Sequence, residues 1–215
     1  MIKGIIFDLD GVLVSTDHLH FEAWKMLAEK FGITGFTRED NERQKGVSRM
    51  DSLEIVLEKG EKQYTQEEKM ALADFKNNYY VELLQNLKQD AVLAGVIDTI
   101  TKLKEKGLLI GIGSVSKNTP LILSKTGLLP YIDKVSCGLD ITKSKPDPEV
   151  FLVAAEKLGL QPEECLVIED SGAGIVAAKA ANMKSIGVGP EYDRLNADYM
   201  VPNLQCEIDW DFILS

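Results

Sequence analysis

The chain has 215 residues, of which 45% are hydrophobic and 27% are charged. This composition is typical of an ordinary globular protein, and the length allows one large domain or a core domain with a smaller insert. The formal net charge of −10 and the sequence pI near 4.8 argue against nucleic acid or an anionic membrane surface as a partner.

Cysteine usage and hydropathy indicate the cellular compartment. Cys137, Cys165 and Cys206 are an odd number without metal-ligand spacing, which favours reduced thiols in a reducing cytosol. A signal peptide could not be cleaved without removing the first predicted strand, and no apolar stretch is long enough to span a membrane. We therefore expect a cytoplasmic protein.

The first predicted element is an apolar run over residues 2–7, which indicates a buried parallel strand. Asp8 and Asp10 follow directly, where the ligands of an open α/β sheet gather. Two carboxylates this close repel each other unless a cation lies nearby, and Mg²⁺ binds carboxylates together with phosphate oxygens. The pattern favours a metal-assisted site in which a carboxylate attacks a phosphoryl group. The alternative is a solvated turn at the strand end, because Asp-x-Asp alone is a short motif.

Residues 15–90 show helical periodicity and no convincing strand. Ser15 or Thr16 can cap a first helix, which ends at Gly32. After it the sequence predicts a polar stretch over residues 37–44, a helix over residues 50–58 and a helix that begins at the capping box of residues 65–68. The segment therefore predicts a small all-helical domain inserted after the first strand.

From residue 93 onwards, helices and strands alternate. The predicted strands cover residues 108–113, 134–137, 165–168, 184–188 and 199–201. The predicted helices cover residues 96–106, a segment opened by residues 114–118, and residues 148–159 and 171–181, with Asp147 as the N-cap of the third. This alternation predicts a doubly wound, Rossmann-like parallel sheet, with residues 1–14 and 91–215 in the α/β core and residues 15–90 in the helical domain.

Further polar residues stand at or near the ends of the later strands: Ser114, Lys145, Glu169 and Asp170. Each has a simpler alternative, because a serine can be a helix N-cap, a lysine is usually solvated and carboxylates favour a helix N-terminus. Together with the first two carboxylates they supply a nucleophile, a metal cage, a hydroxyl and a cation for phosphate oxygens. These are the groups that phosphoryl transfer needs.

Four segments resemble the motifs of the haloacid-dehalogenase-like phosphotransferases: residues 7–12, 113–114, 145–148 and 169–174. The helical segment resembles the small helical cap domain of that superfamily. Three further segments are similar to the β-phosphoglucomutase family: residues 20–25, 45–53 and 114–118. The resemblance covers nearly the whole chain. It also implies a cis peptide bond between Lys145 and Pro146.

The resemblance implies a role for each polar residue of the core. Asp8 is expected to be the nucleophile that forms an aspartyl phosphate, and Asp10 the general acid and base. Ser114 and Lys145 are expected to hold the transferring phosphate. Mg²⁺ is expected to be bound by Asp8, the backbone carbonyl of Asp10 and Asp170, with Glu169 adjacent or ligating through its side chain. The acid role requires a raised pKa for Asp10, which burial would provide.

The substrate-binding residues implied by the resemblance come from the cap and from the loop after the second strand. They are His20, Trp24, Lys45, Gly46, Val47, Ser48, Arg49 and Lys76 from the cap, and Ser116, Lys117 and Asn118 from the core. Arg49 is expected to grip a second phosphate, since its planar fork matches one. Simpler readings are a solvated charge for Arg49, an ordinary half-buried histidine for His20, and cap core for Trp24.

At four positions the chain departs from the β-phosphoglucomutase pattern. Ser15 stands where an acidic residue is common, and Gly113 stands where alanine is usual. Val115 adds bulk beside the phosphate-contacting loop, and Ala94 replaces a proline at the return to the core. None of these changes removes a functional group.

The resemblance implies a β-phosphoglucomutase, which interconverts β-D-glucose 1-phosphate and glucose 6-phosphate through an aspartyl-phosphate enzyme and a β-glucose 1,6-bisphosphate intermediate. Its partners are expected to be small phosphorylated sugars and this bisphosphate, with neither nucleic acid nor membrane, and the chain is expected to be a monomer. Two alternatives stay open: a Mg²⁺-dependent sugar-phosphate phosphatase, and a non-catalytic sugar-phosphate binder.

Overall fold

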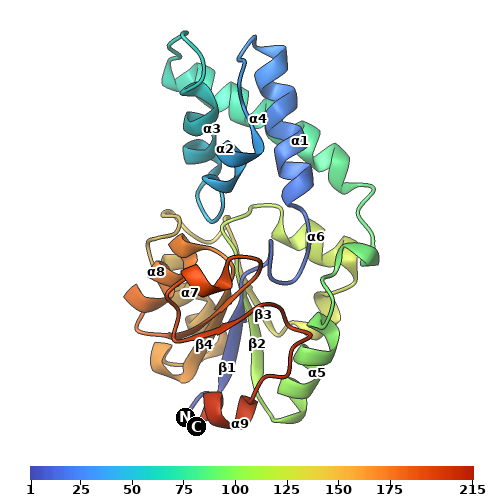
Figure 1. The fold of residues 1–215 in the computed structure, drawn as a ribbon, viewed down its shortest axis with the longest axis vertical. Helices are drawn as coiled ribbons and strands as arrows, with labels where there is room; N and C mark the ends of the chain where they lie inside the picture. The colour runs from blue at the N-terminus through green and yellow to red at the C-terminus, as the bar shows by residue number, and fades with distance from the viewer.

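The computed structural model describes residues 1–215 and contains a six-stranded parallel sheet with helices on both faces (Figure 1). The strand order is β3-β2-β1-β4-β5-β6, so the first strand lies in the interior of the sheet. The strands are β1 (Gly4–Phe7), β2 (Leu109–Gly113), β3 (Lys134–Ser136), β4 (Cys165–Glu169), β5 (Lys184–Val188) and β6 (Tyr199–Val201). This arrangement confirms the predicted doubly wound α/β fold.

Helices cover the two faces of the sheet because alternate side chains of each strand point to opposite sides. Ile5 and Phe7 belong to one hydrophobic cluster, and Ile6 belongs to another. The first face packs against α5 (Val96–Glu105), α6 (Thr119–Thr126) and α9 (Trp210–Leu214). The second packs against α7 (Glu149–Leu158) and α8 (Gly172–Ala180). Four single-turn 3-10 helices lie in the connections, at Gln89–Ala91, Leu129–Tyr131, Pro162–Glu164 and Tyr192–Arg194.

Four helices between β1 and β2 form a separate group beyond the carboxyl ends of the strands (Figure 1). They are α1 (Asp17–Lys30), α2 (Arg38–Glu42), α3 (Arg49–Leu57) and α4 (Gln66–Leu84). Ten buried residues, among them Trp24, Leu27 and Leu53, make a hydrophobic core of their own between these helices. We call this group the cap. The predicted capping box at its longest helix is present, with Thr65 and Glu68 bonded reciprocally.

The chain enters and leaves the cap through two linkers that lie side by side. Ser15 N donates to Ala91 O at 2.8 Å, and Leu93 N donates to Leu13 O at 2.9 Å. Val14 and Val92 form an antiparallel bridge between these bonds. The two linkers therefore make a short two-stranded ribbon at the base of the cap.

Several boundaries differ from the predicted ones. The short helix α2 occupies part of the stretch predicted as a polar connection, and a reciprocal capping box between Thr37 and Asp40 stabilises it. Helix α6 begins only at Thr119, because residues 114–118 form a loop. Helix α7 begins at Glu149, whose backbone N–H donates to Asp147 at 3.1 Å. The C-terminal helix α9 was not predicted. None of the helices combines the length and the apolar character that crossing a membrane requires.

Candidate active site

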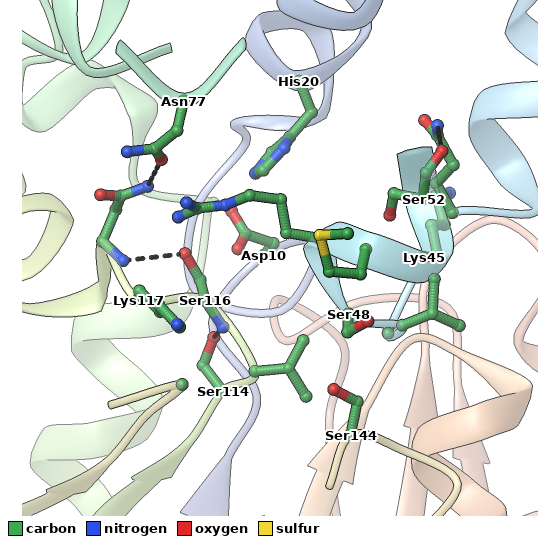
Figure 2. A pocket seen from close by; sticks show the side chains of 18 of the residues that line it. Asp10, His20, Lys45, Ser48, Ser52, Asn77, Ser114, Ser116, Lys117 and Ser144 are labelled. Atoms are coloured by element: carbon green, nitrogen blue, oxygen red, sulfur yellow. Dashed lines mark hydrogen bonds between the residues drawn. The ribbon is translucent and has the colours of Figure 1, made fainter. Parts of the chain in front are cut away.

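A pocket of about 700 Å³ lies between the carboxyl ends of the strands and the cap. Figure 2 shows Ser114, Ser116 and Lys117 of the core on one side of it and Lys45 and Ser48 of the cap on the other. Of the predicted site residues, the pocket is lined by Asp8, Asp10, His20, Trp24, Lys45, Gly46, Val47, Ser48, Arg49, Lys76, Ser114, Ser116, Lys117, Asn118 and Asp170. The two others, Lys145 and Glu169, are fully buried at its base, where Lys145 contacts both Asp8 and Glu169.

Three carboxylates meet at the base of the pocket. One oxygen from each of Asp8, Glu169 and Asp170 lies within 4.8 Å of the others. Burial raises the pKa of Asp8 to about 7, although Lys145 opposes the shift. Burial, then the neighbouring carboxylates Glu169 and Asp8, also raises the pKa of Asp170. Burial and mutual repulsion therefore both disfavour the charged forms of these carboxylates in the absence of a cation.

Lys145 is the ammonium that this cluster shares. It donates to Asp8 Oδ1 and, at 3.1 Å, to Glu169 Oε1. Burial alone would lower the pKa of Lys145, but the charges of Asp8 and Glu169 outweigh that effect and raise it. The lysine is therefore a fixed cation and not the solvated charge of the simpler reading. Its bond to Pro146 is cis, as expected.

Glu169 is held in place by its neighbours. Its Oε1 accepts from Ser171 Oγ at 2.8 Å, and its Oε2 accepts from Asp170 N at 2.8 Å. A side chain at Gly174 would collide with Glu169, and one at Gly11 would collide with Asp170. The glycines of the first and last motifs therefore make room for the carboxylates.

The donor set fits a hard divalent cation such as Mg²⁺, which binds carboxylate oxygens together with phosphate oxygens and water. Three carboxylates lie around a single lysine ammonium, so the ionised cluster would have excess negative charge, which a bound cation would neutralise. The carboxylate of Asp10 is not part of this cluster. Its expected contribution through the backbone carbonyl stays a prediction.

The carboxylate of Asp10 instead accepts a hydrogen bond from the hydroxyl of Thr16. Thr16 is fully buried at the start of the cap, and its side chain makes no capping bond to α1, contrary to the predicted cap. Burial raises the pKa of Asp10 to about 7, with Lys145 opposing the shift. An acid that titrates near neutrality suits proton transfer. Sequence reasoning missed this partner, because Thr16 resembles an ordinary helix cap.

The loop after β2 forms successive turns in which its own polar groups bond to one another. Ser114 Oγ accepts from Ser116 N, and Ser116 Oγ accepts from Asn118 N, both at 3.2 Å. Ser114 is therefore not a helix N-cap. Asn118 Nδ2 donates to Asn77 Oδ1 of α4 at 2.9 Å, which joins core and cap (Figure 2). Sequence reasoning missed Asn77, whose one available signal was its place next to Lys76.

Lys76 and His20 meet inside the cap. Lys76 Nζ lies 3.0 Å from His20 Nδ1, and 4.5 Å and 4.6 Å from the ring centroids of Trp24 and Tyr80. Burial, then the charge of Arg49, lowers the pKa of Lys76 to about 7, and burial followed by Lys76 lowers the pKa of His20 well below its usual value. Trp24 is both a cap-core residue and a pocket residue, because it is buried in the cap core and also lines the pocket.

The loop before α3 brings the cap close to the base of the pocket. Gly46 has φ +72°, and a Cβ there would lie 2.8 Å from Ser171 Oγ of the core. Ser48 Oγ accepts from Asp51 N at 3.1 Å and caps α3, whose first residue is Arg49. The Arg49 side chain is half-buried, with one guanidinium nitrogen 3.8 Å from Asp74. Burial lowers the pKa of Arg49, which nevertheless stays a cation at neutral pH.

Comparisons with known proteins agree with this geometry. The model of the haloacid dehalogenase-like hydrolase family matches residues 5–188. The chain is 41% identical to the beta-phosphoglucomutase of Bacillus subtilis over 202 residues, which are 93% of this chain and 89% of that protein. It is 31% identical to a phosphorylated carbohydrates phosphatase of Thermotoga maritima over 191 residues, which are 86% of this chain and 84% of that protein.

Among solved structures, the crystal structure of beta-phosphoglucomutase from Clostridium difficile matches with a TM-score of 0.91 and 39% sequence identity, covering 99% of this chain and 96% of that chain. The likeness therefore includes the cap as well as the sheet. A family model that spans most of the chain, together with a relative that is 41% identical over 93% of it, places the protein in the haloacid dehalogenase-like hydrolase family.

Proposed function

We propose that the protein is a β-phosphoglucomutase, an isomerase that converts β-D-glucose 1-phosphate into glucose 6-phosphate. The observation that carries this proposal is the pairing of two cationic groups across one pocket. Lys145 lies at the base beside Asp8, and Arg49 enters from the cap. A sugar with phosphates at both ends is the ligand that such a pocket accommodates. The relatives called beta-phosphoglucomutase support the same assignment.

In the first half-reaction, a carboxylate oxygen of Asp8 attacks the phosphorus of a sugar phosphate. The bond between phosphorus and the sugar oxygen breaks, and Asp10 gives its proton to that oxygen. Lys145 and Ser114 hold the oxygens of the transferring group. A bound Mg²⁺, held by Asp8, Asp170 and the Asp10 carbonyl beside Glu169, would neutralise the charge on those oxygens.

In the second half-reaction, the 6-hydroxyl of a bound β-D-glucose 1-phosphate attacks the aspartyl phosphate of Asp8, and Asp10 accepts its proton. The product is β-glucose 1,6-bisphosphate, which must reverse its orientation in the pocket. Asp8 then takes the phosphoryl group at C1 by the first half-reaction, which releases glucose 6-phosphate and restores the phosphoenzyme. Arg49, Ser116, Lys117 and Asn118 bind whichever phosphate is distant from Asp8.

The remaining pocket residues position the sugar. We assign this role to Trp24, to the His20–Lys76 pair and to the loop of residues 45–48, since all of them line the pocket. We further propose that residues 15–90 form the cap domain and that residues 1–14 and 91–215 form the core. In this arrangement a sugar phosphate bound by both parts draws the cap towards the base and excludes water. The active form in this proposal is a monomer with Mg²⁺ as its metal.

A second candidate is a sugar-phosphate phosphatase with the same first half-reaction, in which water resolves the aspartyl phosphate. The relative that favours it is the Thermotoga maritima phosphatase. A non-catalytic binder is disfavoured, because the buried contact of Asp8 with Lys145 is the arrangement that a nucleophile needs.

³¹P NMR separates these functions. The protein is mixed with Mg²⁺, glucose 1,6-bisphosphate and β-glucose 1-phosphate, and the phosphorus signals are followed over time. Formation of glucose 6-phosphate establishes the mutase, and release of inorganic phosphate establishes the phosphatase. An unchanged spectrum contradicts both.

A further inference from the structure

The aromatic ring of Phe151 lies against the ammonium of Lys145. Nζ is 4.7 Å from the ring centroid, and both side chains are fully buried. Phe151 belongs to the first turn of α7, where its backbone N–H donates to Pro148 O at 3.0 Å. The turn at residues 145–148 and the helix after it therefore bring the ring back to the lysine.

Gly113, at the end of β2, provides the space for this ring. A Cβ at position 113 would lie 2.6 Å from Cδ1 and 2.8 Å from Cε1 of Phe151, closer than two non-bonded carbons approach. Ile6 Cγ2 would lie 3.1 Å from the same Cβ, so the added atom is crowded from a second side. Gly113 is part of a regular strand without positive φ. Its lack of a side chain therefore matters for space and not for backbone conformation.

The ring supplies an attraction that uses none of the ammonium's hydrogen atoms. The hydrogen bonds of Lys145 to Asp8 and Glu169 leave a third N–H for an oxygen of the transferring phosphate. When Asp8 becomes an acyl phosphate, negative charge moves from its carboxylate to the phosphoryl oxygens, and Glu169 remains as a competing anion, so the partners of the ammonium change during the reaction. The negative face of an aromatic ring attracts a buried cation without replacing a hydrogen bond.

We propose that Phe151 is a positioning residue that keeps the Lys145 ammonium beside Asp8 during phosphoryl transfer, and that Gly113 admits its ring to that place. The inference rests on one half of the proposed function, the phosphorylation of Asp8. It applies equally to a mutase and to a phosphatase.

The test replaces Phe151 by phenylalanines with one, two and three ring fluorines, which weaken the negative ring face with little change of shape. The rate of Asp8 phosphorylation by acetyl phosphate with Mg²⁺ is measured by rapid quench. We expect the rate to fall stepwise, by about tenfold over the whole series, while the circular dichroism spectrum is unchanged. A rate that is constant across the series overturns the proposal.

Phe75 is the matched control, because Lys30 Nζ lies 4.2 Å from its ring centroid on the cap. The same fluorinated series at Phe75 should leave the rate unchanged. An equal loss at both positions overturns the proposal, since it would show a general effect of fluorination.

A double-mutant cycle tests the role of Gly113. Gly113→Ala should slow phosphorylation when Phe151 is present, because the added methyl group displaces its ring. In the Phe151→Leu background the same change should have little further effect, since that ring is absent. Equal losses in both backgrounds contradict the inference.

The last measurement is independent of turnover. In the full-length protein with ¹³C-labelled lysine, the ε-CH₂ protons of Lys145 should resonate upfield because of the ring current of Phe151, and Phe151→Leu should remove that shift. If the wild type forms no phosphoenzyme, the proposed function fails and the NMR shift alone decides the placement of the lysine. An unchanged Lys145 signal in Phe151→Leu overturns the inference.

Discussion

Lys76 Nζ lies 3.0 Å from Nδ1 of His20, so two basic side chains from different cap helices share one buried hydrogen bond. Both groups cannot be charged at this separation without strong repulsion. The lowered pKa of each agrees with a neutral histidine that accepts from the lysine. A buried base of this kind leaves a measurable pH signature.

Lys76→Met is expected to stabilise the protein in a pH-dependent way. Folding lowers the pKa of Lys76 from 10.5 to about 7, so between these values the unfolded chain binds more protons than the folded chain. The wild-type penalty is therefore complete below about pH 7 and disappears as the pH rises towards 10.5. The gain from the variant should be at most about 5 kcal/mol at neutral or lower pH and should shrink at alkaline pH.

Urea unfolding of both proteins across this pH range measures the difference. Lys69→Met is the control on the same helix, because its ammonium pairs with Glu54 near the surface at 2.7 Å. It should show no comparable gain. A Lys76→Met difference that does not change with pH would refute a charge-based penalty.

Asp8→Asn is expected to abolish turnover and leave the fold intact. An amide cannot form an acyl phosphate, and the carboxylate of Glu169 is already bonded to Lys145, Asp170 N and Ser171. Mass spectrometry of quenched enzyme should show a phosphorylated wild type and an unmodified variant, with circular dichroism as the folding control. Turnover above a trace, with deamidation excluded, would contradict the covalent mechanism.

Asp170→Ala is expected to weaken Mg²⁺ binding by at least tenfold, because few carboxylates hold this ion. Isothermal titration with Mg²⁺ measures the affinity directly, and excess chelator should stop wild-type turnover. Asp98→Ala, at an exposed position in α5, is the control and should bind Mg²⁺ normally. Full activity in chelator would exclude a metal-dependent reaction.

Arg49→Ala is expected to lose mutase activity far more than slow hydrolysis of the phosphoenzyme. Mutase turnover requires that the phosphate distant from Asp8 is bound, whereas hydrolysis of the phosphoenzyme by water does not. Arg49→Lys should recover only part of the loss, since the charge remains but the planar fork does not. Both rates are measured on the same preparation by ³¹P NMR.

Arg43→Ala is the matched control for Arg49, because Arg43 pairs with Glu58 on the exposed side of the cap at 2.8 Å. It should change neither rate. If the two rates of Arg49→Ala fall in parallel, the arginine serves folding or general binding and the cap does not gate the reaction. A wild type that releases phosphate faster than it isomerises would establish the phosphatase.

The strands and their order of appearance could be predicted from the sequence, because buried parallel strands are continuous apolar runs. The meeting of Asp8 with Asp170 was also foreseeable, since both follow strands whose carboxyl ends share one edge of the sheet. Helix α2 was not, because five residues are too few to show a period. Its signal was a capping box closed by Asp40, where a longer acid is the usual partner.

Contacts between distant segments escaped sequence reasoning. Thr16 could be read as a helix cap, and only the folded linker shows that its hydroxyl turns to Asp10. Asn77 and Tyr80 lie on the predicted cap helix, but what they touch depends on how that helix sits over the core and against α1. The burial of Lys145 depends likewise on three segments that meet only in the folded chain. Such contacts depend on tertiary geometry that local periodicity does not encode.

The paired linkers at Val14 and Val92 have a consequence for the evolution of the fold. Because they run side by side, the chain leaves the core and returns to it at one point, and the cap is connected to the core as one long loop. The entropy of closing such a loop grows slowly with its length, so an insert of another size at this point costs the core about 0.6 kcal/mol for each doubling. A shorter or longer segment could therefore replace the cap, together with the residues that line its side of the pocket, without a change in the order or pairing of the catalytic strands.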